Sequence, residues 1–170
     1  EIGILYTNDF NEKVIMKFLN ENQLTFNPLF NAKPHVFVSA FNPLAKKEYV
    51  ELKDLEEYPC LQFEQGEVNS FYFSEEILST VYHKKSIYVS DRATLFNLLI
   101  GLNGYTICSG VLSSDLNGSD IVAVPLKSEE NMLVGWIMNK KAVLSMEAQR
   151  YVDELKKLIV EYGFEVLLSP

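Results

Sequence analysis

Pairs of adjacent glutamates are the groups in this sequence that come closest to acid–base chemistry. They occur at three places: Glu56-Glu57, Glu75-Glu76 and Glu129-Glu130. Neighbouring residues on a helix point in different directions, so no pair can act as general acid and general base on one substrate. We therefore expect all three pairs to be solvated surface. The sequence also lacks a serine, histidine and aspartate in the context of a nucleophile elbow, and we expect no catalytic residues.

Two histidines and two cysteines are the other residues that could bind a metal or act as nucleophiles. They are His35, His83, Cys60 and Cys108. Their spacing matches no arrangement of histidine, cysteine and carboxylate ligands that holds a metal. We therefore expect neither a metal nor a cofactor. Both cysteines lie inside apolar runs, which predicts small buried thiols in a reduced, cytoplasmic protein.

One segment does point to a ligand. The apolar run Ile87-Tyr88-Val89 leads directly into Ser90 and Asp91, which open an apolar helical pattern. In an open α/β sheet, ligands bind beyond the carboxyl ends of the strands, where the N-terminus of a helix offers unpaired N–H groups. We predict that Ser90 is the N-cap and can donate its hydroxyl to a ligand, and that Asp91 turns aside or meets a ligand amine. The alternative is a structural cap alone.

Other polar residues also follow predicted strands. Tyr6 and Thr7 end the first apolar run, Ser39 ends the strand that begins at His35, and Gln65 follows Phe63. Each alone is more often a turn or cap residue. Together with Ser90 and Asp91, we expect them to converge on a cleft with hydrogen-bonding walls.

The hydrophobic pattern predicts the strands and helices that would position these residues. The predicted strands are 2–6, 24–30, 35–39, 60–63, 87–89, 104–108, 121–126 and 132–138. One predicted helix begins after Asp9, with Glu12 completing a capping box, and a short one begins near Leu52. Three further helices are predicted over residues 75–82, 90–102 and 145–162. Pro28 cannot donate to a ladder, so its strand should be an edge strand. The order strand, helix, strand across 87–108 predicts a parallel βαβ unit and an α/β fold.

Length and composition limit the function further. A chain of 170 residues is about one domain, and 48% hydrophobic with 22% charged residues is globular rather than disordered. The net charge of −8 speaks against a chain that binds nucleic acid on its own. The apolar runs are shorter than the ~18 residues that a membrane-spanning helix needs. No signal peptide is visible, but the first residue is Glu1, so we expect a processed or partial chain, and a removed signal stays open.

Four segments, in this order, carry a family resemblance. They are His35–Ser39 with Asn42-Pro43-Leu44-Ala45; Leu52-Lys53-Asp54-Leu55 with Tyr58-Pro59; Val89-Ser90-Asp91 to Gly101-Leu102-Asn103-Gly104-Tyr105; and Val124-Pro125-Leu126 with Val134-Gly135-Trp136-Ile137 and the last helix. They resemble, in turn, the strand and HPLA element, the L-x-D-L…P helix, the GlG turn and the closing segment of the effector-binding domains of LysR-type transcriptional regulators. Asn42 stands in the place of the family's histidine, and Asn103 and Tyr105 alter the turn. The resemblance spans roughly residues 1 to 162.

The resemblance implies a type II periplasmic-binding-protein-like fold, with two Rossmann-like lobes joined by crossing strands. Residues 1–40 and 127–170 would form part of the first lobe, and residues 41–126 the whole second lobe. The family's first strands and helices, and its DNA-binding winged helix-turn-helix, have no counterpart before Glu1. The first lobe would therefore be incomplete, and its open face would favour association of subunits.

The resemblance also implies the partners. A small metabolite, for which an amino acid or another carboxylate is our first guess, would be held by Tyr6, Thr7, Ser39, Gln65, Ser90 and Asp91. It would favour one closure of the lobes and so reset the packing of a homodimer or tetramer, with DNA bound only through the N-terminal domain and no membrane partner. Three alternatives remain open at this point: an extracytoplasmic solute-binding protein, an enzyme of the same fold, and a plain α/β interaction module.

Overall fold

The structure is a computed structural model that describes residues 1–66 and 70–167. The chain forms two compact units, and each contains its own sheet. Unit 1 consists of residues 1–32 and 131–170, and unit 2 of residues 33–130. Two crossings of the chain join them, because unit 2 is inserted between the two halves of unit 1.

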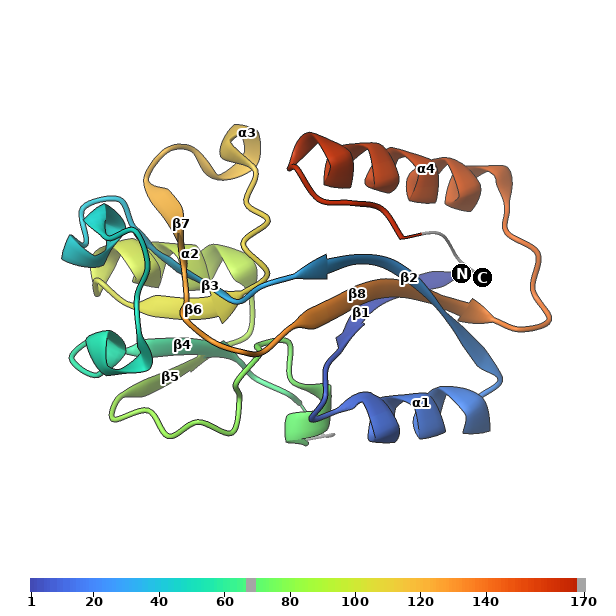
Figure 1. The fold of residues 1–170 in the computed structure, drawn as a ribbon, viewed down its shortest axis with the longest axis horizontal. Coiled ribbons are helices and arrows are strands. Elements are labelled where there is room, and N and C mark those ends of the chain that lie inside the picture. Colours follow the sequence, from blue (N-terminus) through green and yellow to red (C-terminus); the bar gives the residue numbers. More distant parts are fainter. Residues whose placement is uncertain (67–69, 168–170) are drawn as a thin grey trace. The chain divides into compact units, whose positions relative to one another are not determined.

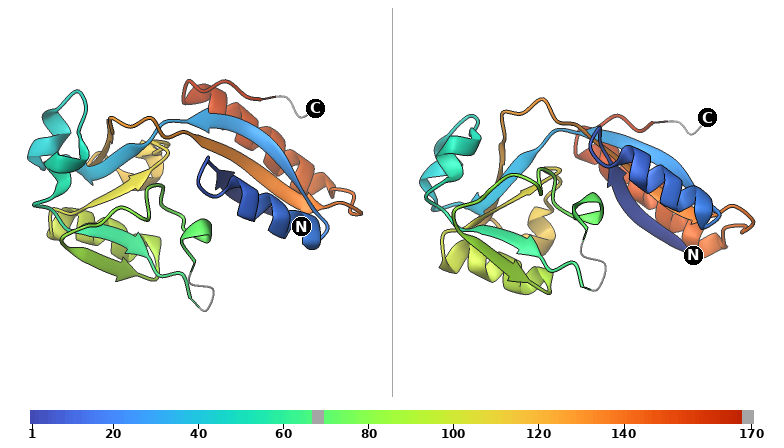
Figure 2. Two further views of the ribbon diagram at one scale, coloured as in Figure 1. Left: turned by 60° about the horizontal axis from the view of Figure 1, so that its bottom comes forward. Right: turned by 90° about the horizontal axis from the view of Figure 1, so that it is seen from below.

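Unit 1 is a three-stranded antiparallel sheet in the order β1-β8-β2. Its elements are β1 (Ile2–Thr7), α1 (Glu12–Glu21), β2 (Leu24–Ala32), β8 (Met132–Asn139) and α4 (Met146–Glu161). Strand β8, from the C-terminal half, lies between two strands from the N-terminal half. Strand β2 lies at the edge, as Pro28 predicts, and its register shifts between Pro28 and Phe30. Helices α1 and α4 lie on opposite faces of this sheet (Figures 1 and 2).

The two helices of unit 1 begin in different ways. Helix α4 follows the prediction, because the Ser145 hydroxyl accepts a hydrogen bond from the N–H of Ala148 at 3.2 Å. The expected capping box of Asp9 and Glu12 is not formed. Instead, the side-chain oxygens of Asn8 and Asn11 accept hydrogen bonds from each other's N–H groups, at 3.0 and 2.8 Å. The asparagine pair closes its own turn, which moves the helix start to Glu12.

Unit 2 is a five-stranded mixed sheet in the order β5-β4-β6-β3-β7. Its elements are β3 (His35–Ser39), η1 (Pro43–Lys46), η2 (Leu52–Leu55), β4 (Cys60–Phe63), η3 (Phe71–Phe73), β5 (Ser86–Val89), α2 (Arg92–Gly101), β6 (Tyr105–Cys108), α3 (Ser114–Asn117) and β7 (Ile121–Pro125). Strands β5 and β6 are both parallel to β4, which confirms the parallel unit predicted around α2. Strand β3 runs antiparallel to both of its neighbours.

The core of unit 2 lies between the sheet and α2. Leu61, Val89, Leu95 and Leu99 are buried there, together with Phe37 and Ile121. Only one face of α2 is buried, because Ile100 is 43% exposed and the C-cap residue Leu102 is 49% exposed. The helix therefore has an open apolar side.

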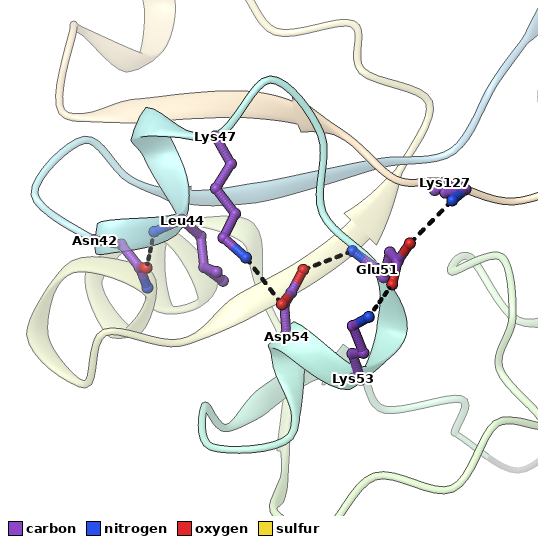
Figure 3. A network of polar contacts seen from close by, with 7 residues as sticks. All are labelled: Asn42, Leu44, Lys47, Glu51, Lys53, Asp54 and Lys127. Atoms are coloured by element: carbon purple, nitrogen blue, oxygen red, sulfur yellow. Dashed lines mark hydrogen bonds and ion pairs between the residues drawn. The ribbon is translucent and has the colours of Figure 1, made fainter.

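A network of polar contacts holds the 3-10 helices η1 and η2 of unit 2 (Figure 3). The Asn42 side chain accepts a hydrogen bond from the N–H of Leu44 at 2.8 Å. Asp54 accepts one from the N–H of Glu51 at 3.0 Å and pairs with Lys47 at 2.8 Å. The Glu51 carboxylate also pairs with Lys127, just beyond β7, at 3.0 Å. Surface ion pairs stabilise little, so this network fixes the path of residues 42–55 more than it adds stability.

The predicted helix at 75–82 is wrong. This segment forms bends and turns, and Leu78 has a φ of 62°, which a right-handed helix does not allow. Glu76 and Ile77 are both buried, at 5% and 1% exposed. Two adjacent side chains, Glu76 and Ile77, are therefore both buried in unit 2. In an amphipathic helix the buried side chains would instead be three or four residues apart.

No helix in the described part of the chain is long and apolar enough to cross a membrane.

Candidate functional site

The parallel strands of unit 2 end at one edge of its sheet. Because β4, β5 and β6 run in the same direction, the residues after Phe63, Val89 and Cys108 meet at that edge. Gln65 lies two residues beyond β4, and Ser90 directly follows β5. The structure thus brings together the ends of β4 and β5, which is where ligands bind in open α/β sheets.

A cavity of about 350 Å³ opens at this edge. Its polar lining consists of Gln62, Glu64, Gln65, Ser74, Glu76, Ser79 and Tyr88, and the rest of the lining is Phe63, Gly66 and Phe71. The size lies within the range of sites for small ligands, ~300–1,000 Å³. All of these residues belong to unit 2.

Strand alternation explains why the lining is polar. Gln62 of β4 is paired with Tyr88 of β5. Their neighbours Leu61 and Val89 point into the core against α2. Successive side chains of a strand point to opposite faces, so Gln62 and Tyr88 share the face opposite α2. Residues 71–79 pass over this face and complete the cavity.

Glu76 is the buried carboxylate of the cavity. It is 5% exposed, so the expectation of a solvated pair at Glu75-Glu76 is wrong for this residue. One of its oxygens accepts a hydrogen bond from the N–H of Phe63 at 2.7 Å, and the other from the hydroxyl of Ser74 at 3.0 Å. Burial raises the pKa of Glu76 above its ordinary value, and these two hydrogen bonds oppose that rise in part.

Gln62 is the buried amide of the cavity. It is 8% exposed and sits in the otherwise apolar strand β4. No side-chain nitrogen or oxygen in the described part of the chain is both buried and without a hydrogen-bond partner, and the Gln62 amide is accessible to solvent in the cavity. An amide can donate two hydrogen bonds and accept two. The amide therefore presents hydrogen-bonding capacity to whatever occupies the cavity.

The six residues that the sequence predicted as ligand contacts are divided between the two units. Tyr6 and Thr7 lie in unit 1, whereas Ser39, Gln65, Ser90 and Asp91 lie in unit 2. Of these four, only Gln65 lines the polar cavity. Ser39 lies at the opposite edge of the sheet, because β3 runs antiparallel to β6. It is buried, and its hydroxyl accepts a hydrogen bond from the N–H of Phe41 at 3.2 Å.

Asp91, rather than Ser90, caps helix α2. One Asp91 carboxylate oxygen accepts a hydrogen bond from the N–H of Thr94 at 2.9 Å, and the other from the Thr94 hydroxyl at 2.7 Å. These bonds lower the pKa of Asp91. Ser90 is exposed at the same edge of the sheet and is not the N-cap. The prediction that Ser90 is the N-cap of this helix is therefore wrong.

The described residues contain no cluster of three or more histidine, cysteine or acidic side chains that could hold a metal. His83 is half-buried, and its Nδ1 lies 2.8 Å from the Tyr105 hydroxyl oxygen. Burial lowers the pKa of His83. It also raises the pKa of the Cys60 and Cys108 thiols to about 12. Neither thiol is therefore an activated nucleophile at neutral pH.

Comparison with known proteins identifies the family. The model of the LysR substrate binding domain matches residues 12–159. The chain belongs to the LysR substrate binding domain family. No curated protein matches the chain. Domains of this family sense effectors for LysR-type regulators and have the type II periplasmic-binding-protein-like fold, so the resemblance drawn from the sequence is confirmed.

Solved structures of the same family share the fold at low identity. The effector-binding domain of QuiR, in complex with shikimate, is 18% identical, with a TM-score of 0.57, over 95% of this chain and 71% of that one. The reduced OxyR regulatory domain from Pseudomonas aeruginosa is also 18% identical, with a TM-score of 0.58, over 94% of this chain and 71% of that one. HinK, a LysR family regulator from Pseudomonas aeruginosa, is 17% identical, with a TM-score of 0.60. That match covers 92% of this chain but 52% of HinK, about half of its length.

Two residues of the sequence, Gln62 and Glu76, point to the cavity of this LysR-family domain. Gln62 is a single amide in an apolar four-residue strand, and a polar residue in such a strand must face a partner or a ligand. Glu76 lies two residues after Ser74, with which it bonds, but its burial depends on the path of residues 71–79. That path is set by tertiary contacts, which periodicity does not reveal.

Proposed function

We propose that this chain is the effector-sensing domain of a LysR-type transcriptional regulator, and that it binds a small metabolite without transforming it. The family match over residues 12–159 is the observation that carries the proposal. The polar cavity at the ends of β4 and β5 supports it, because it offers hydrogen-bonding groups where α/β domains hold ligands.

In this proposal the regulator acts in the cytoplasm as a homodimer or tetramer. DNA is bound by a winged helix-turn-helix that precedes the domain, in keeping with the net charge of −8 on this chain. The proposed first lobe is residues 1–40 and 127–170 and the second is residues 41–126, while the compact units divide the chain nearby, at 32/33 and 130/131. The effector changes the balance between two arrangements of the regulator, and the preferred arrangement sets the contacts with DNA.

The six residues predicted from the sequence are kept as proposed effector contacts. Gln65 contributes from the wall of the cavity, and Ser90 and Asp91 from the same edge of the sheet. Tyr6 and Thr7 contribute from the end of β1, and Ser39 is retained from the sequence although it lies at the other edge of its sheet. Of these residues, Ser90 offers the clearest test, because its side chain is exposed and does not cap α2.

The test is a thermal-shift screen of metabolites on the full-length regulator, followed by DNA binding with each ligand found. A ligand at a hundred times its Kd should stabilise the folded state by about 2.7 kcal/mol. It should also change the affinity for operator DNA, and Ser90→Ala should weaken its binding with little loss of stability. A parent gene that opens with another kind of domain, or a regulator whose DNA binding responds to no metabolite, would contradict the proposal.

A further inference from the structure

The cavity of unit 2 is acidic. Two carboxylates line it: Glu76 is buried in its wall, and Glu64 is exposed at its rim. Among the described lining residues there is no lysine, arginine or histidine. The remaining polar groups are the amides of Gln62 and Gln65 and the hydroxyls of Ser74, Ser79 and Tyr88.

Gln62 adds a neutral hydrogen-bonding group to this cavity. Its side chain is 8% exposed and lines the cavity, where the amide is accessible to solvent. Apolar side chains fill the other face of the same strand. A ligand that enters the cavity displaces water from this amide and must replace the hydrogen bonds that the water made. Gln62 and Glu76 therefore present two acceptors, an amide oxygen and a carboxylate, to the same small space.

We infer that this cavity binds a small ligand through an ammonium group and rejects a free carboxylate. An ammonium group has three N–H donors and no acceptor, which suits the Glu76 carboxylate and the Gln62 amide oxygen. A ligand carboxylate would instead lie beside a buried carboxylate with no lining cation to offset the repulsion. The inference rests on the proposed function, names the ligand class for this cavity, and replaces the carboxylate that the sequence suggested.

Charge can be tested separately from size with three four-carbon probes. They are 1,4-diaminobutane, 1,4-butanediol and succinate, which differ mainly in their terminal groups. Each is titrated into the isotopically labelled chain at neutral pH and constant ionic strength, and the Kd is read from amide chemical shifts. We expect 1,4-diaminobutane to bind at least about tenfold more tightly than either other probe, a difference of about 1.4 kcal/mol. The largest shifts should fall in residues 62–66 and 74–79.

Two glutamate variants distinguish binding in the cavity from nonspecific attraction of the diamine by the negative charge of the chain. Glu76→Gln should weaken the binding of 1,4-diaminobutane about tenfold. Glu75→Gln is the matched control, because it removes the same charge one residue away from an exposed side chain outside this cavity. It should change the Kd less than twofold. Gln62→Leu should also weaken binding, and it serves as the second test if Glu76→Gln does not fold.

Four outcomes would overturn the inference. They are succinate or the diol binding as tightly as the diamine, equal effects of the two glutamate variants, diamine shifts that fall outside the cavity, and no binding by any probe. These outcomes can be told apart from failure of the proposed function. A regulator that responds to a carboxylate effector bound in this cavity would refute the ligand class and leave effector sensing intact, whereas a regulator without any effector would refute both.

Discussion

The buried carboxylate of Glu76 should make the stability of the domain depend on pH. Its pKa is raised by burial in the folded chain and returns to its ordinary value, 4.5, on unfolding. Between these two values the folded state binds more protons than the unfolded state, so the free energy of unfolding falls as pH rises through that window. The full stabilisation is present below the unfolded pKa. Glu76→Gln removes the titrating group, and we expect a flatter dependence in urea unfolding measured across this window. An unchanged slope would contradict the burial of Glu76.

The two cysteines should be unreactive while the domain is folded. Both lie in apolar runs, and the structure confirms that Cys60 is buried, while Cys108 is only partly so. Burial raises the pKa of both thiols to about 12, which leaves very little thiolate at neutral pH. We expect a disulfide exchange reagent to modify them more than about a hundredfold more slowly in buffer than in denaturant. Rapid modification of either thiol in the folded chain would show that the strand ends open readily.

At the scale of single elements, the start of helix α2 can be tested by exchanging its two cap-type residues. The Asp91 side chain accepts two hydrogen bonds from Thr94, whereas Ser90 precedes the cap. Asp91→Ala should lower the urea midpoint for unfolding of unit 2, because it removes the N-cap. Ser90→Ala should change stability by less than about 0.5 kcal/mol, as expected of an exposed residue outside such features. Chemical unfolding of both variants gives the comparison, and a larger loss for Ser90→Ala would return the cap to the serine.

This helix start also shows how far the sequence could be read. The pattern of apolar residues predicted the helix, its capping chemistry and the parallel strands on either side of it. It could not choose between two adjacent residues that both favour the N-cap position, because propensity differs little between serine and aspartate. The direction of β3 relative to its neighbours could not be predicted from the sequence for a similar reason. A buried strand has the same sequence pattern whether it runs parallel or antiparallel, so Ser39 was expected at the wrong edge of the sheet.

The helix predicted over residues 75–82 was wrong for a different physical reason. Their apolar spacing allows a helix, but the chain buries Glu76 and Ile77 side by side and passes through a positive φ at Leu78. The hydrogen bonds from Phe63 and Ser74 to Glu76 come from residues outside that window. Tertiary contacts therefore override local propensity, and they do so at the wall of the candidate site. The polar cavity was for that reason harder to predict than the strands that support it.

At the scale of the whole molecule, the order of the motifs identified the family although no single motif is specific. The match over residues 12–159 confirms that reading. The chain path explains why order carries so much information. Unit 2 is inserted between the two halves of unit 1, so the elements of unit 1 must appear at both ends of the sequence. Strand β8 has to return between β1 and β2, which constrains the closing segment as strongly as the opening one.

This connectivity predicts that the two units differ in their ability to fold alone. Unit 2 is one continuous stretch, residues 33–130, with its own five-stranded sheet and a core formed with α2. Expressed by itself, this stretch should unfold cooperatively and retain the preference for 1,4-diaminobutane, since the whole cavity lies within it. Residues 1–32 contain β1 and β2 but lack β8, the strand that joins them, and should be unfolded alone. Circular dichroism and amide spectra of the two fragments make the comparison. If residues 33–130 stay unfolded while the full chain folds, the stability of unit 2 must come from contacts that its own sheet and core do not supply.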